Sequence, residues 1–215
     1  MSSNHSNAPS PRPVRILLTG FGPFPTVANN ASAGLVAALA KRARDEFPDC
    51  KIMFAVLPTE WEKAPAQLGG LLAGFEPDIV LSFGVARDAT GFRIETQGLN
   101  ACRLAPDAAG QPPFGSVLRA NGPISHACTA PLMAIIDRLG ACGLPVSLSD
   151  DAGGYLCNAV FYHTLEAAAA RGGGMSVAFI HIPADLSTGP LTFEMALSGA
   201  IEIIRASLQS VPVND

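Results

Sequence analysis

Charged residues are scarce in this chain, and runs of one sign are absent. Only 15% of the 215 residues are charged, and 14 basic side chains against 18 acidic ones leave a net charge of −4 at pH 7. Binding to a phosphate backbone depends on clustered Lys and Arg. We therefore expect no nucleic-acid partner, and a small or peptidic substrate instead.

Long apolar runs are also missing. No stretch of about 18 uninterrupted apolar residues occurs, which is the length that a membrane-spanning helix requires. Residues 1–13 are rich in Ser, Asn and Pro, without the apolar segment of a secretory signal. We expect no membrane partner, a flexible tail over residues 1–13, and a single domain over residues 14–215.

Cysteine occurs five times, an odd number, and never as C-x-x-C; the positions are Cys50, Cys102, Cys128, Cys142 and Cys157. This usage fits neither a disulfide framework nor a zinc site. The sequence therefore predicts a reducing, cytoplasmic location and no metal.

Apolar residues make up 48% of the chain and fall into alternating strand-like and helix-like segments. Short apolar runs predict strands at 14–19, 51–57, 78–83, 92–99, 146–148 and 176–182. Helices are predicted at 30–47, 59–75 with an interruption near Pro65, 125–139, 156–170 and about 190–208, with an irregular stretch at 106–123. The alternation predicts an α/β fold, with a mainly parallel, twisted sheet between two layers of helices.

Cys157 follows a double-glycine turn, Gly153-Gly154, and stands in the first turn of a predicted helix. A helix N-terminus presents unpaired N–H groups and about half a positive charge, which favours a thiolate and can receive an oxyanion. Cys157 is therefore a candidate nucleophile. A small buried hydrophobic residue is the alternative, since that is the usual role of a free cysteine.

His181 ends the predicted strand 176–182 and is a candidate base for Cys157. If the strand at 146–148 runs parallel to it, both residues lie at the same edge of the sheet. The alternative is a hydrogen-bonded structural histidine. His5 lies in the tail, His126 opens a predicted helix, and His163 faces away from Cys157 on the same helix.

Glu95 is an unusual carboxylate within a predicted strand, and such a residue needs a partner. It is a candidate third group that orients the histidine. Asp150 and Asp151 are rivals, although both suit the turn before Gly153. Alternatively, Glu95 is an exposed edge-strand residue paired with Arg93 or Arg103.

Four separated blocks of the chain resemble the pyroglutamyl-peptidase I family, cysteine peptidases that remove an N-terminal pyroglutamate. The blocks are Leu18-Thr19-Gly20-Phe21-Gly22-Pro23-Phe24 with Asn30-Ala31-Ser32, Gly84 to Asn100, Gly154-Tyr155-Leu156-Cys157-Asn158 with Phe161-Tyr162, and Phe179-Ile180-His181-Ile182-Pro183. The resemblance runs from about residue 14 to residue 208. It implies a phosphorylase/hydrolase-like α/β/α sandwich.

Carried over position by position, the resemblance implies that Cys157 is the nucleophile, His181 the general base and acid, and Glu95 the orienting residue. The implied reaction is hydrolysis, through an acyl-enzyme, of the bond after an N-terminal pyroglutamyl residue of a peptide. The resemblance implies no cofactor and a homodimer or homotetramer.

The resemblance also implies a pocket for the lactam ring. Phe21 and Phe24 line it, Tyr155 and Leu156 lie near it, and Arg103 lies close to the substrate. A pyroglutamyl residue has no charged amine, so apolar walls and backbone hydrogen bonds suit it better than a carboxylate.

This chain departs from the family mainly in the pocket. Residues 84–89 read Gly-Val-Ala-Arg-Asp-Ala, without the family's glutamine and Gly-Gly pair, and Thr96 replaces an arginine. Two further interpretations therefore stay open: a Cys-dependent amidase of shifted specificity, and a non-catalytic α/β binding protein. The turn at Gly20 to Gly22 lacks the third glycine of a dinucleotide site, which disfavours a nucleotide-binding enzyme.

Overall fold

The computed structural model describes residues 12–24 and 27–211. Residues 1–11 of the expected flexible tail lie outside the described residues. The elements are β1 (Arg15–Phe21), α1 (Ala31–Glu46), β2 (Lys51–Leu57), α2 (Lys63–Phe75), β3 (Ile79–Ala86), β4 (Phe92–Glu95), β5 (Gln97–Leu99), β6 (Ser125–Ala127), α3 (Leu132–Ala141), β7 (Val146–Ser149), α4 (Leu156–Ala170), β8 (Ser176–Pro183) and α5 (Phe193–Leu208).

The main sheet has six strands in the order β2-β1-β3-β8-β4-β7. Strands β2, β1, β3 and β8 run parallel to one another. Strand β4 pairs antiparallel with β8 and parallel with β7. The expected mainly parallel sheet is confirmed. The assumption that β7 runs parallel to β8 is wrong, because β4 reverses the direction between them.

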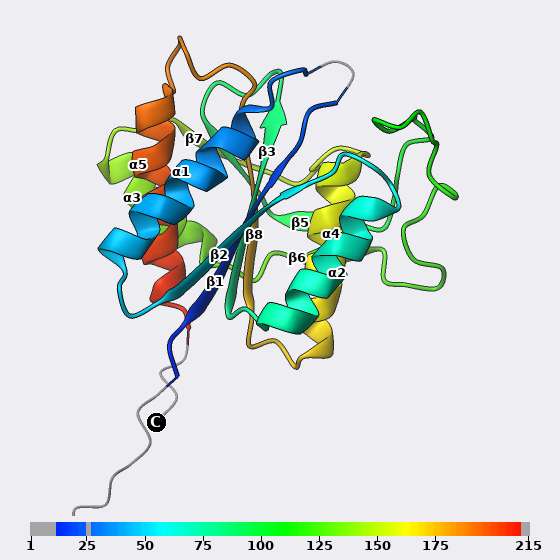
Figure 1. The fold of residues 1–215 in the computed structure, drawn as a ribbon, viewed down its shortest axis with the longest axis horizontal. Helices are drawn as coiled ribbons and strands as arrows, with labels where there is room; N and C mark the ends of the chain where they lie inside the picture. Colours follow the sequence, from blue (N-terminus) through cyan, green and yellow to red (C-terminus); the bar gives the residue numbers. More distant parts are fainter. Residues whose placement is uncertain (1–11, 25–26, 212–215) are drawn as a thin grey trace, which may run out of the picture.

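Helices cover both faces of the sheet, as the α/β interpretation predicts. Figure 1 shows α1, α3 and α5 on one side and α2 and α4 on the other. Two apolar clusters correspond to these layers, and β8 supplies both: Ala178, Ile180 and Ile182 face one cluster, and Val177 and Phe179 face the other. A strand buried on both faces is apolar throughout, which explains why the position of β8 could be predicted from the sequence.

The predicted strand at 92–99 is divided between two sheets. β4 belongs to the main sheet, whereas β5 pairs antiparallel with β6 in a separate two-stranded sheet. This pairing also corrects the predicted helix at 125–139, because residues 125–127 form β6 and helix α3 begins only after Pro131. Strand β5, the partner of β6, lies about 28 residues earlier in the chain, so a local sequence pattern cannot predict the pairing.

Two helix starts also differ from the prediction. Helix α2 begins at Lys63 instead of residue 59, and Pro65 lies in its first turn without interrupting it. The N–H groups of a first turn have no partner within the helix, so a proline there removes nothing. Helix α5 begins at Phe193, after Thr192, whose hydroxyl accepts a hydrogen bond from the Met195 N–H.

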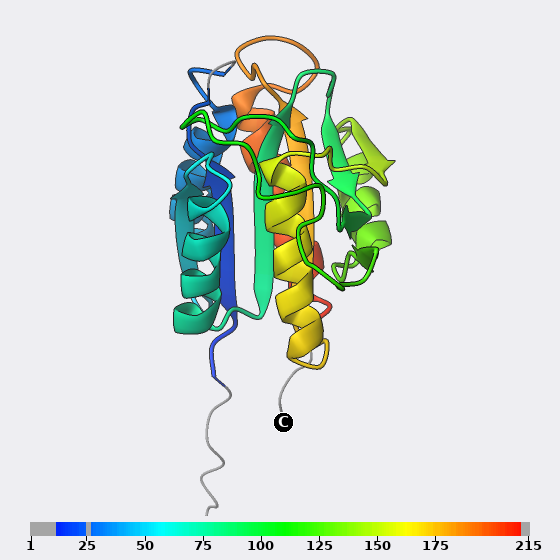
Figure 2. The same cartoon turned by 90° about the vertical axis from the view of Figure 1, so that its right-hand side faces the viewer.

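The irregular stretch expected at 106–123 contains no helix or strand. In Figures 1 and 2 this green segment runs over the outer side of α4. The side chain of Asn158 joins α4 to β5: its amide donates to the Leu99 and Ala101 carbonyls, and its oxygen accepts from the Leu99 N–H. The start of α4 is thereby tied to the segment that leads into the excursion.

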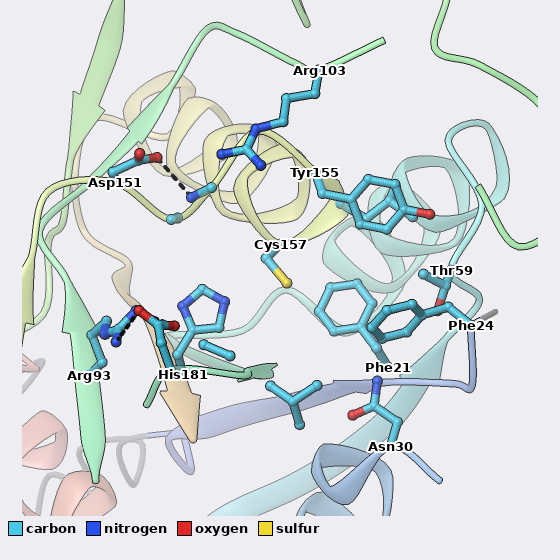
Figure 3. Close-up of a pocket in the computed structure, with 16 residues that line it drawn as sticks. Phe21, Phe24, Asn30, Thr59, Arg93, Arg103, Asp151, Tyr155, Cys157 and His181 are labelled. Carbon is cyan, nitrogen blue, oxygen red and sulfur yellow. Dashed lines mark hydrogen bonds and ion pairs between the residues drawn. The ribbon is translucent and has the colours of Figure 1, made fainter. Parts of the chain in front are cut away.

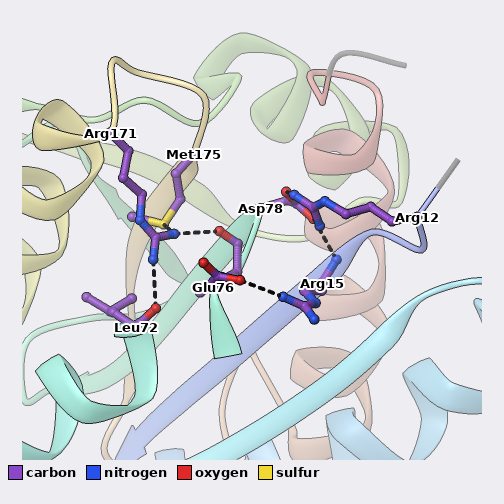
Figure 4. Close-up of polar contacts among 8 residues, drawn as sticks. Arg12, Arg15, Leu72, Glu76, Asp78, Arg171 and Met175 are labelled. Carbon is purple, nitrogen blue, oxygen red and sulfur yellow. Dashed lines mark hydrogen bonds and ion pairs between the residues drawn. The ribbon is translucent and has the colours of Figure 1, made fainter. Parts of the chain in front are cut away.

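Arginines hold the end of the sheet where the parallel strands begin (Figure 4). Arg12 and Arg15 pair with Asp78 and Glu76, which precede β3. Arg171 donates to the Leu72 and Pro77 carbonyls, so its charge lies at the C-terminal end of α2. These contacts leave the opposite edge, where β1, β2, β3 and β8 end, for a ligand site.

Gly98→Ala is predicted to destabilise the fold by about 1–3 kcal/mol. A Cβ at Gly98 would lie 2.8 Å from the backbone nitrogen of Tyr162 in α4, and neither backbone can move without breaking a pairing. Urea unfolding monitored by circular dichroism measures the effect. Gly140→Ala is the matched control, since a Cβ there meets nothing within 4 Å. Equal stability of the two variants would contradict this account of β5.

Candidate active site

A pocket of about 360 Å³ opens at the edge where the parallel strands end. Its walls come from the loops after β1, β2 and β3, from the end of β8, from β4 and from the start of α4. It is lined by Phe21, Phe24, Asn30, Thr59, Val85, Ala86, Asp88, Arg93, Arg103, Asp151, Ala152, Gly153, Tyr155, Leu156, Cys157 and His181. All the residues expected at the substrate are therefore among its lining.

Cys157 is the second residue of α4 and lies half-buried at the centre of the pocket (Figure 3). No side chain caps this helix start, so the N–H groups of its first turn face the pocket end without an intramolecular acceptor. Gly84 of β3 lies against the thiol, since a Cβ added there would come 3.0 Å from Cys157 Sγ. Glycine at this position lets the sulfur reach the sheet.

The path of the chain to Cys157 differs from the one expected. Because β7 runs antiparallel to β8, the two strands do not end at the same edge. Residues 150–155 instead lead the chain from β7 to the start of α4, where the double glycine makes the turn; Gly153 has a φ of +79°, which favours glycine. The expected meeting of Cys157 and His181 holds for a different topological reason.

His181 and Glu95 form a buried pair. The Nδ1 atom of His181 lies 2.7 Å from Oε1 of Glu95, and the two residues are 6% and 0% exposed. In the β4/β8 register His181 is opposite Arg93, and Glu95 is opposite Phe179. Glu95 is therefore a diagonal neighbour of His181 on the same face of the sheet, within reach of its side chain.

The His181 ring lies between Glu95 and Cys157. With Nδ1 directed at Glu95, Nε2 is left for the thiol, and the side chains of Cys157 and His181 are neighbours in the pocket (Figure 3). Burial lowers the pKa of His181, but hydrogen bonds to Cys157 and Glu95, together with their negative charges, outweigh burial and raise that pKa to about 9. The imidazolium is thus the favoured form near neutral pH.

The alternatives for the third group lie elsewhere. Asp151 accepts a hydrogen bond from the Gly153 N–H within its turn, and the Asp150 carbonyl accepts from the Gln97 amide. Arg93 pairs with Asp88 at 3.0 Å and not with Glu95. Of the described residues that contact His181, Glu95 is the one carboxylate in hydrogen-bond range.

The other histidines lie outside the pocket. His126 is in β6, not at a helix start as expected, and its ring is tilted by 52° against that of Tyr162, with centroids 4.9 Å apart. His163 contacts Glu166 on the outer side of α4. His5 is outside the described residues. His181 is therefore the one described histidine that lines the pocket.

One half of the pocket, here called the aromatic end, is formed by Phe21, Phe24, Tyr155 and Leu156. The rings of Phe24 and Tyr155 are 6.3 Å apart, and Tyr155 contacts Trp61 edge-on at 5.2 Å. Asn30 and Thr59 also line the pocket, but both donate to the Gly22 carbonyl and so hold the loop that carries Phe24. A ligand at this end therefore meets apolar walls and backbone groups.

The other half, here called the charged end, is formed by Asp88, Arg93, Arg103 and Asp151. Figure 3 shows Arg93, Arg103 and Asp151 on the opposite side of Cys157 from Phe21 and Phe24. The sequence analysis identified Arg103 here, considered Asp151 only as a rival third group and Arg93 only as a partner of Glu95, and gave Asp88 no role of its own. For Asp88 a signal was available, because it follows β3 at the edge where the parallel strands end and loops line ligand sites.

Residues 103–111, here called the strap, contact Trp61 and Tyr155 and are anchored by Asp107. Its carboxylate accepts from the N–H groups of Trp61, Ala109 and Gln111, each at 2.9 Å. Burial raises the pKa of Asp107, but these hydrogen bonds prevail and lower it. Trp61 Nε1 donates to the Ala105 carbonyl. The sequence analysis gave Asp107 no role, although an Asp three residues before Gly110 is typical of a turn.

The described residues contain no group of three or more His, Cys, Asp or Glu side chains arranged to hold a metal ion. No helix among them is long and apolar enough to cross a membrane.

Comparison with known proteins gives a consistent result. The profile of the family described as pyroglutamyl peptidase matches residues 14–205. A pyrrolidone-carboxylate peptidase of Treponema denticola is 31% identical over 94% of this chain and 95% of its own. Pyrrolidone-carboxylate peptidase 1 of Ralstonia nicotianae is 35% identical over 78% of this chain and 77% of its own.

Solved structures agree. A mutant pyrrolidone carboxyl peptidase from Pyrococcus furiosus superposes with a TM-score of 0.84 at 26% identity, over 93% of this chain and all of that one. Pyroglutamyl peptidase I from Bacillus amyloliquefaciens gives a TM-score of 0.83 at 25% identity, again over 93% and 100% of the two chains. The expected fold class is confirmed.

Cys157→Ala is predicted to lower the pKa of His181 by about one unit or more. Without the sulfur, burial still lowers this pKa, and Glu95 alone opposes it. Titration of ¹³C-labelled histidine rings by NMR measures the change, with the His181 signal identified by its loss in His181→Gln. Cys142→Ala is the control, because Cys142 is exposed and outside the pocket. An unchanged His181 titration would show that the thiol and the imidazole are not coupled.

Proposed function

The chain belongs to the pyroglutamyl peptidase family, and from that premise we propose that it hydrolyses the bond after an N-terminal pyroglutamyl residue of peptides, using Cys157, His181 and Glu95. The observation that carries the proposal is the buried His181–Glu95 contact of 2.7 Å beside a thiol at a helix start. A buried carboxylate, an imidazole and a thiol in this order form an arrangement that activates a cysteine.

Cys157 acts as the nucleophile. In the thiolate–imidazolium pair its proton is on Nε2 of His181, and the thiolate attacks the carbonyl carbon that joins pyroglutamate to the next residue. The N–H groups of the first turn of α4 stabilise the oxyanion, together with the positive end of the helix. The tetrahedral intermediate then collapses, the C–N bond breaks, and a thioester to the pyroglutamyl group forms.

His181 transfers the proton in both directions. As imidazolium it protonates the leaving amine, and as imidazole it then removes a proton from the water that attacks the thioester. Hydrolysis releases pyroglutamate and restores the thiolate–imidazolium pair. Glu95 holds the ring through Nδ1 and stabilises its positive charge, so that Nε2 faces the reacting atoms.

The aromatic end supports recognition of a neutral lactam. Phe21 and Phe24 supply flat apolar surface, and Tyr155 and Leu156 extend it to the helix that carries Cys157. None of the side chains that line this end is acidic, so an unblocked N-terminal ammonium would find no carboxylate to pair with there. Pyroglutamate is favoured over glutamate on the same ground.

Release of aminomethylcoumarin from pyroglutamyl-aminomethylcoumarin tests the proposal. The purified protein under reducing conditions is expected to cleave it, and to leave the compound with a free N-terminal glutamyl residue intact. Cys157→Ser is expected to lower kcat/KM by about a thousandfold or more, and Glu95→Gln by about a hundredfold or more. Cys142→Ser is the matched control and is expected to retain full activity, because Cys142 lies outside the pocket.

The alkylation rate of Cys157 separates the ways in which the proposal could fail. Absence of cleavage with a rapidly alkylated Cys157 would overturn the pyroglutamyl specificity and favour a Cys-dependent amidase acting on another small amide. Absence of cleavage with slow alkylation would favour a non-catalytic α/β binding protein, because an ordinary thiol is mostly protonated at neutral pH.

A further inference from the structure

The two ends of the pocket differ in charge, and Cys157 lies between them (Figure 3). With pyroglutamate at the aromatic end, the carbonyl carbon is at the sulfur, and the peptide beyond the scissile bond extends over the charged end. This inference therefore rests on the proposed function. The charged end then determines which leaving groups are accepted.

Arg103 is the group at the charged end with a free cationic head. The guanidinium of Arg93 is occupied by both carboxylate oxygens of Asp88, at 3.0 and 3.2 Å. Within the described part of the chain, the Arg103 guanidinium makes no hydrogen bond or ion pair, and Asp151, the other acid of this end, is bound to the Gly153 N–H instead. An arginine that lines a pocket without a partner is suited to an anionic ligand group.

The position of Arg103 is set by the same turn that presents the nucleophile. Its backbone N–H donates to the Gly154 carbonyl at 2.7 Å, and its stem lies so close that a Cβ on Gly154 would be 2.5 Å from Arg103 Cγ. Gly154 is three residues before Cys157. The same turn therefore positions both Arg103 and the thiol of Cys157.

The strap holds Arg103 from the other side. Asp107 ties the strap to Trp61 through a 2.9 Å hydrogen bond, and the Tyr155 hydroxyl donates to the Pro106 carbonyl. The backbone at Arg103 is consequently fixed at both ends, so little backbone entropy remains to be lost when the guanidinium binds a ligand.

We propose that Arg103 binds a carboxylate of the leaving group, so that the protein prefers pyroglutamyl substrates in which the part after the scissile bond carries a negative charge close to that bond. Two sources supply this chemistry: the C-terminal carboxylate of a pyroglutamyl dipeptide, and the side chain of Asp or Glu in the residue after pyroglutamate. A guanidinium pairs with either through two parallel N–H···O hydrogen bonds.

Paired peptides that differ in a single charge test the preference. kcat/KM is measured for pyroglutamyl-alanine against its C-terminal amide, and for pyroglutamyl-glutamyl amide against pyroglutamyl-glutaminyl amide. In the wild type, the charged member of at least one pair is expected to be hydrolysed about five- to tenfold better, and the pair that shows this identifies the source of the carboxylate. Salt at about 0.5 M is expected to reduce the ratio.

Arg103→Gln is expected to bring the ratio of kcat/KM for the charged substrate to that for the neutral substrate close to one. Arg103→Lys keeps the positive charge but lacks the planar pair of N–H donors, so it is expected to retain part of the preference. The ratio is internal to each variant, so a general loss of activity does not affect it. Arg119→Gln is the matched control, because it removes an equal charge from the irregular segment that follows Arg103. Arg119 pairs with Glu166 outside the pocket, so this variant is expected to keep the wild-type ratio.

The outcomes separate this inference from the proposed function. Failure of the wild type to cleave pyroglutamyl-aminomethylcoumarin would remove the proposed function. Cleavage of that neutral compound with equal rates on both members of each pair, or with a preference that Arg103→Gln leaves unchanged, would overturn the role of Arg103 alone.

Discussion

A carboxylate without solvent exposure must be paired, and the contact of Glu95 with His181 meets that requirement in the middle of the sheet. The pairing depends on the direction of β4. Because β4 is antiparallel to β8, Glu95 comes diagonally opposite His181 on the face that α4 covers. The paired ring is then charged and directed at Cys157, and the orientation of α4, the absence of a side chain at Gly84 and the tie of Asn158 to β5 all maintain that alignment.

Cys157 divides the pocket into two environments with different structural origins. Loops that follow parallel strands form the aromatic end, where polar side chains such as Asn30 and Thr59 are occupied in shaping the loops. The charged end is formed around β4 and the turn before α4; there Arg93 is paired with Asp88, and Arg103 has no partner among the described residues. The strap connects the two ends of the pocket, since its Asp107 holds Trp61 and its Arg103 rests on Gly154.

Much of the fold could be predicted from the sequence, because buried parallel strands are continuous apolar runs and their helices have caps and amphipathic patterns. The failures occur where pairing is non-local. Residues 92–99 have a uniform strand pattern, yet Thr96 separates strands of two different sheets. Residues 125–127 become a strand only because residues 97–99 are beside them. Strand direction has no local signature either: the sequence analysis brought Cys157 and His181 to one edge on the condition that β7 and β8 are parallel, and the two residues meet although these strands are antiparallel.

The sequence by itself determined the alternation of strands and helices, the helix start at Cys157, and the resemblance that makes Cys157, His181 and Glu95 the candidate catalytic residues. Each of these depends on short segments whose backbone preferences and polarity are local. The tertiary structure decided which carboxylate pairs with His181, which arginine has no partner among the described residues, and how the pocket divides into its two ends. Those properties depend on the register of β4 against β8 and on contacts between segments tens of residues apart, and such contacts are set by the packing of the whole chain.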